Sequence, residues 1–483
     1  MMSVLLSRMI RFGMVLLLCM QGLSSLHAQP LLADRPATEG DRSTAAPPRH
    51  RVLFIATSNV PKGKFRNLEA IATSAGFAVE ARYLSQISAD ADASIYDGFD
   101  AVFIDSYQVD SVKAQLAKSL PGLKVPHVWL YDKQPEWGGL SAASAQTLLD
   151  YYSNGGEQNF RGFFAILAAT LDGKPAPRDV LPPVKFPTTA VYHPHLPGLV
   201  SADLKTYLHW AKATPDKPII AVLIHQQYIA SMQTGFIDDL IARIEAQGAT
   251  PLVLYAPAME AGSLAPWLRP NPNAPPQADV LINTQIMLDA EGRRKEFTAI
   301  GIPVIQAMPY RKGDADAWRA DPQGVALMDV PFYFAQPEYA GVFDIQVAAT
   351  TRKSDDAIVA IPEQADAVVN KAINLAKLRR KANADKQLAL MFWNYPSGEK
   401  NLSASFLNVP RSLQSTLDGL RAAGYALPKT PDEALLIEKL QRLLAPSYRD
   451  GLLEALLADD LAALLPVSRY QAWLASLPSD IQD

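Results

Sequence analysis

The sequence of 483 residues is poor in the residues that build many common sites. It contains one cysteine, Cys19, and seven histidines. A single cysteine cannot form a disulfide within the chain or supply a multi-thiolate metal site. Charged residues make up 19% of the chain, the formal net charge is −4, and no run of lysine and arginine is present. Charge of this sign excludes a typical nucleic-acid-binding protein.

Several catalytic signatures are also missing from the sequence. No Gly-x-x-x-x-Gly-Lys-Ser/Thr segment occurs, so we expect no ATP site of the P-loop type on this chain. No Gly-x-Gly-x-x-Gly follows an expected strand, no Gly-x-Ser-x-Gly elbow is present, and no His-Glu-x-x-His occurs. Dinucleotide binding, serine hydrolysis of the elbow type and zincin chemistry are therefore not indicated.

The first 28 residues have the pattern of an export signal. Arg8 and Arg11 precede an apolar run over residues 12–20, and small residues lead to a cleavage position after Ala28. An uncleaved anchor is the alternative, but the run is shorter than the roughly 20 residues of a membrane span. Cleavage would remove Cys19 and change the net charge from −4 to −6. We expect an exported, periplasmic protein without a stable membrane span.

The rest of the chain predicts an α/β fold with several domains. Short apolar runs alternate with amphipathic segments, which is typical of parallel sheets covered by helices. After a flexible linker at 29–50 we expect α/β domains at 51–190 and 191–365, successive Rossmann- or flavodoxin-like units. A third α/β unit is expected at 366–428, with its first strand at 387–393, and a helical segment at 429–483. The strongest expected strands are 52–56, 100–105, 218–224, 251–255 and 303–305.

Two histidines lie two residues apart in the segment Tyr192-His193-Pro194-His195. In an extended chain both imidazoles would point to one side. His193 and His195 could then form half of a metal site, and Tyr192 and His193 could contact an acidic group of a ligand. The alternative is a surface proline loop with one structural histidine.

His225 and Glu338 are the other candidate substrate-binding residues. His225 follows a buried strand, and strand ends of this kind in α/β sheets often face a ligand crevice. A histidine satisfied within the core is the alternative. Glu338, in the turn-rich segment 336–341, could orient a metal or a pyrrole N–H, or it could be a loop carboxylate or helix cap.

Several segments together resemble the cobaltochelatase CobN and magnesium chelatase H-subunit family. They follow one another in the family's order and spacing over residues 50–480, and they are 151–159, 191–194, 207–210, 302–307, 336–341, 378–390 and 407–412. The resemblance implies a large subunit that binds a tetrapyrrole ring, corrinoid or porphyrin, with cobalt or magnesium as the substrate ion. It also implies separate ATPase subunits as partners, which agrees with the missing P-loop.

The chain departs from that family pattern in three respects. It stops where family members continue into a larger C-terminal half, so the insertion-site residues assigned there cannot be transferred. It starts with an export signal, whereas biosynthetic family members are generally cytoplasmic. His195 and Ala340 stand where the family has aspartates. By itself we expect the chain to be inactive in metal insertion, a reaction of the ligases that form nitrogen–metal bonds.

Three hypotheses follow from the sequence. The first is the large subunit of an ATP-dependent chelatase in cobalamin or chlorophyll-type biosynthesis. The second is an exported, ATP-independent tetrapyrrole- or metal-binding protein that acts in uptake. The third is a non-functional remnant. The leader discriminates between the first two.

Overall fold

The computed structural model describes residues 48–130, 136–258, 261–391, 394–459, 461–477 and 479–482. The predicted signal peptide at 1–28 and the linker up to residue 47 lie outside these ranges. Within them, no helix combines the length and apolar character that crossing a bilayer requires. The described chain divides into two compact units at residues 377 and 378.

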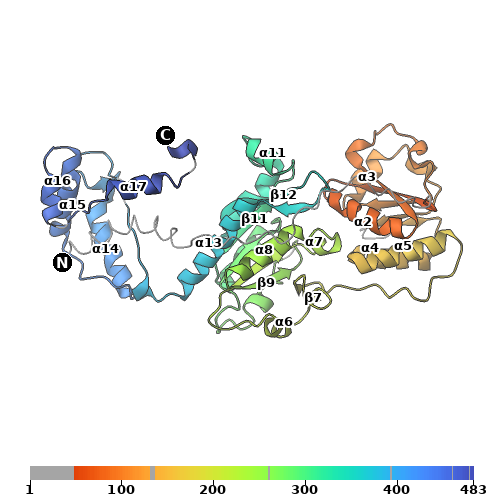
Figure 1. The fold of residues 1–483 in the computed structure, drawn as a ribbon, viewed down its shortest axis with the longest axis horizontal. Coiled ribbons are helices and arrows are strands. Elements are labelled where there is room, and N and C mark those ends of the chain that lie inside the picture. The colour runs from red at the N-terminus through yellow and green to blue at the C-terminus, as the bar shows by residue number, and fades with distance from the viewer. Residues whose placement is uncertain are drawn as a thin grey trace. The chain divides into compact units, whose positions relative to one another are not determined.

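The first sheet lies with α2 to α5 in the red-to-yellow part of the chain in Figure 1. It has five strands in the order β2-β1-β3-β4-β5. β1 to β4 are parallel and β5 is antiparallel. The strands are β1 (His50–Ala56), β2 (Phe77–Tyr83), β3 (Ala101–Asp105), β4 (His127–Leu130) and β5 (Trp137–Gly138). The accompanying α-helices are α2 (Lys62–Ser74), α3 (Val109–Gln115), α4 (Ala142–Asn154) and α5 (Glu157–Leu171).

The central strands of the first sheet, β1 and β3, are buried on both faces because nearly all of their inner residues are apolar. Val52 and Phe54 of β1 pack in the apolar cluster that contains residues of α2, α4 and α5. Leu53 and Ile55, which alternate with them, pack in the cluster that contains residues of α3. The continuous apolar runs seen in the sequence are therefore buried parallel strands.

The second sheet has eight strands in the order β13-β12-β11-β10-β8-β9-β6-β7. The five from β12 to β9 are parallel, and β13, β6 and β7 are antiparallel edge strands. They are β6 (Ala190–Tyr192), β7 (Val200–Ser201), β8 (Ile219–Ile224), β9 (Thr250–Tyr255), β10 (Val280–Asn283), β11 (Val304–Pro309), β12 (Phe343–Thr351) and β13 (Ile358–Ala360).

Helices cover both faces of the second sheet. α8 (Gly235–Ala246) and α13 (Pro362–Arg380) pack on one face. α6 (Leu204–Trp210), α9 (Ala265–Leu268) and α10 (Ala290–Ile300) pack on the other. Short elements connect the strands: α7 (Gln227–Ala230), α11 (Ala315–Ala320), a π-helix (Pro331–Ala335) and α12 (Gln336–Tyr339). The predicted α/β fold class with parallel sheets is confirmed.

The first and second sheets meet at a tight joint formed by Gly155, Gly156 and Ala230. The turn between α4 and α5 places both glycines at positive φ, 63° and 81°. The amide of Gly156 donates to the carbonyl of Ala230 at 2.9 Å. A Cβ on Gly155 would lie 2.1 Å from that same carbonyl oxygen. Only glycine allows this approach of the two backbones.

The described residues of the unit from residue 378 onward are mainly helical. Its helices are α14 (Val409–Ala422), α15 (Glu433–Leu444), α16 (Leu453–Ala458), α17 (Val467–Leu474) and α18 (Ser479–Gln482). The only strands in its described residues are the two-residue pair β14 (Ser403–Ala404) and β15 (Leu407–Asn408).

The prediction of a strand at 387–393 is wrong for residues 387–391, the part that the structure describes. Residues 387–391 form no strand, and Met391 is 91% exposed. No described strand of this unit lies alongside to complete its hydrogen bonds, and a strand without a partner is not stable in water. The described residues of this unit therefore contain no parallel sheet.

Candidate functional site

The parallel strands of the two sheets follow the same order, so the edges formed by their carboxyl ends can be compared directly. In each sheet the first parallel strand along the chain lies between the second and the third: β1 between β2 and β3, and β8 between β9 and β10. The chain therefore reverses direction across the sheet at β1/β3 and at β8/β10. In open α/β sheets, ligands bind outside the carboxyl ends of the strands at such switch points.

At the switch point of the second sheet, buried amides fix the loops that follow the strands. Asn283, at the end of β10, donates to the side-chain oxygen of Gln306 on β11 at 2.7 Å. The Gln285 amide donates to the carbonyls of Ile224 and Ala256, both at 2.8 Å. These bonds connect the ends of β8, β9, β10 and β11, so the residues that follow the strands are held rigidly.

His225 follows β8 at this edge, where the sequence placed a possible ligand contact. The Ile286 amide donates to its Nε2 at 3.2 Å, so the ring proton resides on Nδ1. Burial lowers the pKa of His225 to about 4, and the positive charge of Arg293 acts in the same direction. His225 is thus neutral at pH 7, with an Nδ1–H that has no hydrogen-bond partner among the described residues.

Together with His225, we group Tyr228, Arg311, Asp329 and Tyr333 as the carboxyl-edge cluster. The rings of His225 and Tyr228 lie 6.5 Å apart. Tyr333 and Arg311 are close enough to Tyr228 to influence its pKa, which burial raises. Arg311 forms an ion pair with the buried carboxylate of Asp329.

The equivalent point of the first sheet is closed. Lys64 and Asp105 are 0% exposed, and the Lys64 ammonium lies 2.7 Å from Asp105 Oδ2. The Tyr152 hydroxyl donates to the same oxygen at 2.7 Å, and desolvation by burial lowers the pKa of Lys64. These residues bind one another and leave no access for a ligand. The cluster around His225 is therefore the better candidate site.

His225 predicts a pH dependence of stability. Its pKa is lower than the ~6.5 of an unfolded histidine, so between those values only the unfolded chain binds the proton. The stabilisation is complete above pH ~6.5 and is lost as the pH falls toward 4. We expect the difference in unfolding free energy between wild type and His225→Asn to shrink by about 1 kcal/mol per pH unit in this window.

Urea titrations of both proteins at pH 7, 6 and 5 measure that difference. His193, whose pKa burial also lowers, is present in both proteins and its contribution cancels. A pH dependence that is identical in the two proteins would contradict the assignment of His225 as a buried neutral side chain.

Tyr192, His193 and His195 lie away from the carboxyl-edge cluster. Tyr192 pairs with Val253, which pairs with Val222, so His193 is level with the middle of β8 and is separated from it by β9. The Tyr192 hydroxyl donates to Asp238 at 2.8 Å. The structure does not bring this segment together with His225.

Both ring nitrogens of His193 already have partners. Nε2 lies 3.3 Å from Glu245, and Nδ1 accepts from the amide of His195 at 3.2 Å. The His193 ring packs against Trp210, with centroids 4.8 Å apart. Among the described residues, no three histidine, cysteine or acidic side chains are grouped so that they could hold a metal. Metal binding by His193 and His195 stays a prediction.

Glu338 is exposed on the one-turn helix α12 and has no described side-chain hydrogen bond. Its neighbour Tyr339 donates to Glu291 of α10 at 2.9 Å, so this turn belongs to the outer helical layer. Ala340, where the resemblance has an aspartate, is buried with Phe297 and Ile300. The turn therefore supplies no buried carboxylate near His225.

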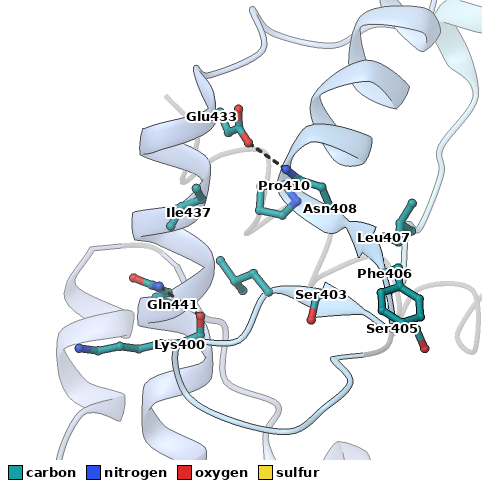
Figure 2. Close-up of a pocket in the computed structure, with 11 residues that line it drawn as sticks. Lys400, Ser403, Ser405, Phe406, Leu407, Asn408, Pro410, Glu433, Ile437 and Gln441 are labelled. Atoms are coloured by element: carbon teal, nitrogen blue, oxygen red, sulfur yellow. Dashed lines mark hydrogen bonds between the residues drawn. The ribbon is translucent and has the colours of Figure 1, made fainter.

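A shallow pocket of about 390 Å³ lies in the unit from residue 378 onward. Figure 2 shows it between the β14–β15 hairpin and α15, with Asn408 bonded to Glu433 across one end. The Gln441 amide and the Ser403 hydroxyl are bonded to backbone carbonyls. With most of its polar side chains already bonded, the pocket offers fewer unpaired donors than the carboxyl-edge cluster.

Comparison with known proteins identifies the family. Residues 149–483, more than half of the chain, match the family described as CobN/Magnesium Chelatase. The chain belongs to this family. The earlier resemblance to CobN and the magnesium chelatase H subunit is confirmed.

Individual relatives agree with the family assignment. The chain is 28% identical over 359 residues to the aerobic cobaltochelatase subunit CobN of Pseudomonas aeruginosa, covering 71% of this chain and 27% of that protein. It is 25% identical over 316 residues to the chloroplastic magnesium-chelatase subunit ChlH of Oryza sativa subsp. indica, covering 60% and 23%. It thus spans about a quarter of the length of these relatives.

A solved structure shows the same fold. The catalytic subunit of cobaltochelatase from Mycobacterium tuberculosis superimposes with a TM-score of 0.60 at 22% identity, covering 90% of this chain and 35% of that one.

One of the motifs shared with the CobN/magnesium chelatase family has a structural role here. The segment 151–159 forms the end of α4, the Gly155-Gly156 turn and the start of α5. The buried Asn159 side chain donates to the carbonyls of Gly155 and Val184 and accepts from the Val184 amide. The motif fixes the joint between the two sheets and the chain that links them.

Four members of the cluster, Tyr228, Arg311, Asp329 and Tyr333, were not predicted from the sequence. Arg311 could have been found from its position, because it is the second residue after β11. Residues that follow parallel strands lie at the edge of the sheet where ligands often bind. Tyr228 and Tyr333 carry no such signal, because aromatic residues in apolar segments usually serve the core.

Proposed function

We propose that this chain contributes the tetrapyrrole-binding function of a chelatase large subunit that inserts cobalt or magnesium. The family match over residues 149–483 carries the proposal. Relatives named as cobaltochelatase and magnesium-chelatase subunits support it. The metal ion is a substrate, and separate ATPase subunits are the expected partners for insertion. Because the chain spans about a quarter of those relatives, we expect binding but no insertion by this chain alone.

The carboxyl-edge cluster is the proposed contact for the ring. It lies at the switch point of the larger sheet, and it combines a neutral histidine with tyrosine hydroxyls and an arginine. Small-molecule sites in α/β proteins are typically of this kind, with a few convergent polar groups in a mainly apolar wall.

Titration of the purified chain with protoporphyrin IX and with a cobinamide-type corrinoid tests the proposal. We expect a Soret shift, or quenching of tryptophan fluorescence, that saturates with a Kd in the micromolar range or tighter, without ATP or partner proteins. The ring that binds more tightly would identify the branch. No saturable binding of either ring would contradict a tetrapyrrole-binding role for this chain.

The leader at residues 1–28 favours a second candidate function, an exported protein that binds a tetrapyrrole or metal during uptake. Periplasmic location is part of this proposal, and it would separate the chain from cytoplasmic ATP. Mass spectrometry of the protein from fractionated cells tests it. A mature N-terminus at Gln29 in the periplasmic fraction supports export, and an intact Met1 in the cytoplasm contradicts it.

A further inference from the structure

We propose that the carboxyl-edge cluster recognises an ionised carboxylate of the ligand. This inference rests on the proposed function and adds the chemical group that the site holds. It follows from the kind of donors in this cluster, most of which have no acceptor among the described residues.

The two tyrosines of the cluster have unpaired hydroxyl groups. Tyr228 and Tyr333 are only 8% and 5% exposed. Neither hydroxyl has a hydrogen-bond partner in the described part of the chain. Burial raises the pKa of both phenols, that of Tyr333 to about 12, so both remain donors at neutral pH.

His225 provides a third donor. Its Nε2 is occupied by the Ile286 amide, so the unpartnered Nδ1–H is available to an acceptor. The loop that fixes His225 also reaches the π-helix, because the Met287 amide donates to the carbonyl of Phe332 at 3.1 Å. His225 and Tyr333 are therefore connected through two consecutive backbone contacts, at Ile286 and Met287.

Arg311 supplies the positive charge. Its side chain is 52% exposed, whereas its partner Asp329 is 3% exposed. A guanidinium has five N–H donors, and the ion pair with Asp329 uses one Nη2 atom and leaves the others directed toward solvent. A partly paired arginine of this kind is oriented in advance for a second carboxylate.

Together these donors favour an anion over a neutral amide or a cation. A cation would meet only donors, since Asp329 is already neutralised by Arg311. An amide could accept these hydrogen bonds but would lose the charge assistance, which roughly doubles the strength of each bond. A planar carboxylate accepts several bonds at once, so it fits this donor set best.

Two forms of one ring test the inference. Protoporphyrin IX and its dimethyl ester have the same macrocycle, and only the free acid carries carboxylates. With the purified full chain we expect the ester to bind about tenfold more weakly or worse. Succinate is then added as a competitor. Displacement of the ring by succinate would show that the site accepts a small free dicarboxylate, and no displacement would show that the carboxylate must be carried by the ring.

Variants locate the effect on the cluster. Tyr228→Phe combined with Tyr333→Phe removes both hydroxyls and keeps both rings, and we expect it to abolish most of the preference for the acid. Tyr255→Phe is the matched control, because it likewise removes a hydroxyl without a described partner, but the Tyr255 hydroxyl is buried in the core at β9. It should leave the preference unchanged.

The outcomes separate the two proposals. Equal binding of acid and ester, unaffected by the double variant, would overturn the carboxylate inference and leave tetrapyrrole binding intact. Binding of succinate but of no ring, sensitive to the double variant, would support the carboxylate and contradict the tetrapyrrole. If protoporphyrin IX, its dimethyl ester, the corrinoid and succinate all fail to bind wild type, both proposals are overturned.

Discussion

Gly155→Ala is expected to lower the free energy of unfolding by about 3 kcal/mol or more. The added Cβ would lie 2.1 Å from the carbonyl oxygen of Ala230, which belongs to backbone and cannot rotate away. In addition, Gly155 has φ 63° and ψ −166°, a conformation open almost only to glycine. Either the joint separates or the turn distorts, and both are unfavourable.

Gly173→Ala is the matched control for Gly155→Ala. Gly173 has nearly the same φ, 64°, but a Cβ there would meet no atom within 4 Å. Gly173→Ala therefore measures the cost of a side chain at positive φ without a steric clash, and we expect it to lower the free energy of unfolding by about 1 kcal/mol. Chemical denaturation of both variants gives the comparison. Similar losses at the two glycines would show that the close contact with Ala230 contributes nothing.

Lys64→Met is expected to cost about 3–5 kcal/mol of unfolding free energy, because it leaves the Asp105 carboxylate buried without its counter-charge. Asp105 is fully buried, and its Oδ1 atom already lacks a hydrogen bond in the described structure. Methionine fills a similar volume, so loss of packing is a minor part of the effect.

Two comparisons isolate the buried charge at Asp105. Lys118→Met removes the exposed pair with Asp90, whose side chains are 65% and 83% exposed, and should cost at most about 0.5 kcal/mol. Adding Asp105→Asn to Lys64→Met removes the unpaired charge and should recover part of the loss. If the double variant is no more stable than Lys64→Met, the charge is not the cause.

The sequence predicted β1 to β4 and β8 to β11, because their apolar runs match the burial of parallel strands. It did not predict the parallel strand β12 or the antiparallel strands β5, β6, β7 and β13. The segment 387–391 shows the limit of that argument: an apolar pattern forms a strand only where another strand completes its hydrogen bonds. Residue spacing cannot show whether such a partner is present.

The candidate site was only partly predictable, for a similar reason. His225 was found because it ends a clear strand. Arg311 and Tyr333 reach it only because the sheet order places β11 and the following π-helix near β8, across β10. Local patterns do not encode that order. Conversely, the spacing of His193 and His195 suggested a ligand pair, and the structure gives both nitrogens of His193 other partners.

The one-turn helix α7 has a further consequence for how this molecule responds to a ligand. Tyr228 of α7 belongs to the carboxyl-edge cluster, and Ala230, two residues later, accepts the hydrogen bond from Gly156. A ligand that contacts Tyr228 therefore binds two residues from the joint between the sheets. Thermodynamic reciprocity then applies: if a change at the joint, such as Gly155→Ala, alters ligand affinity, the ligand alters the stability of the joint by the same factor.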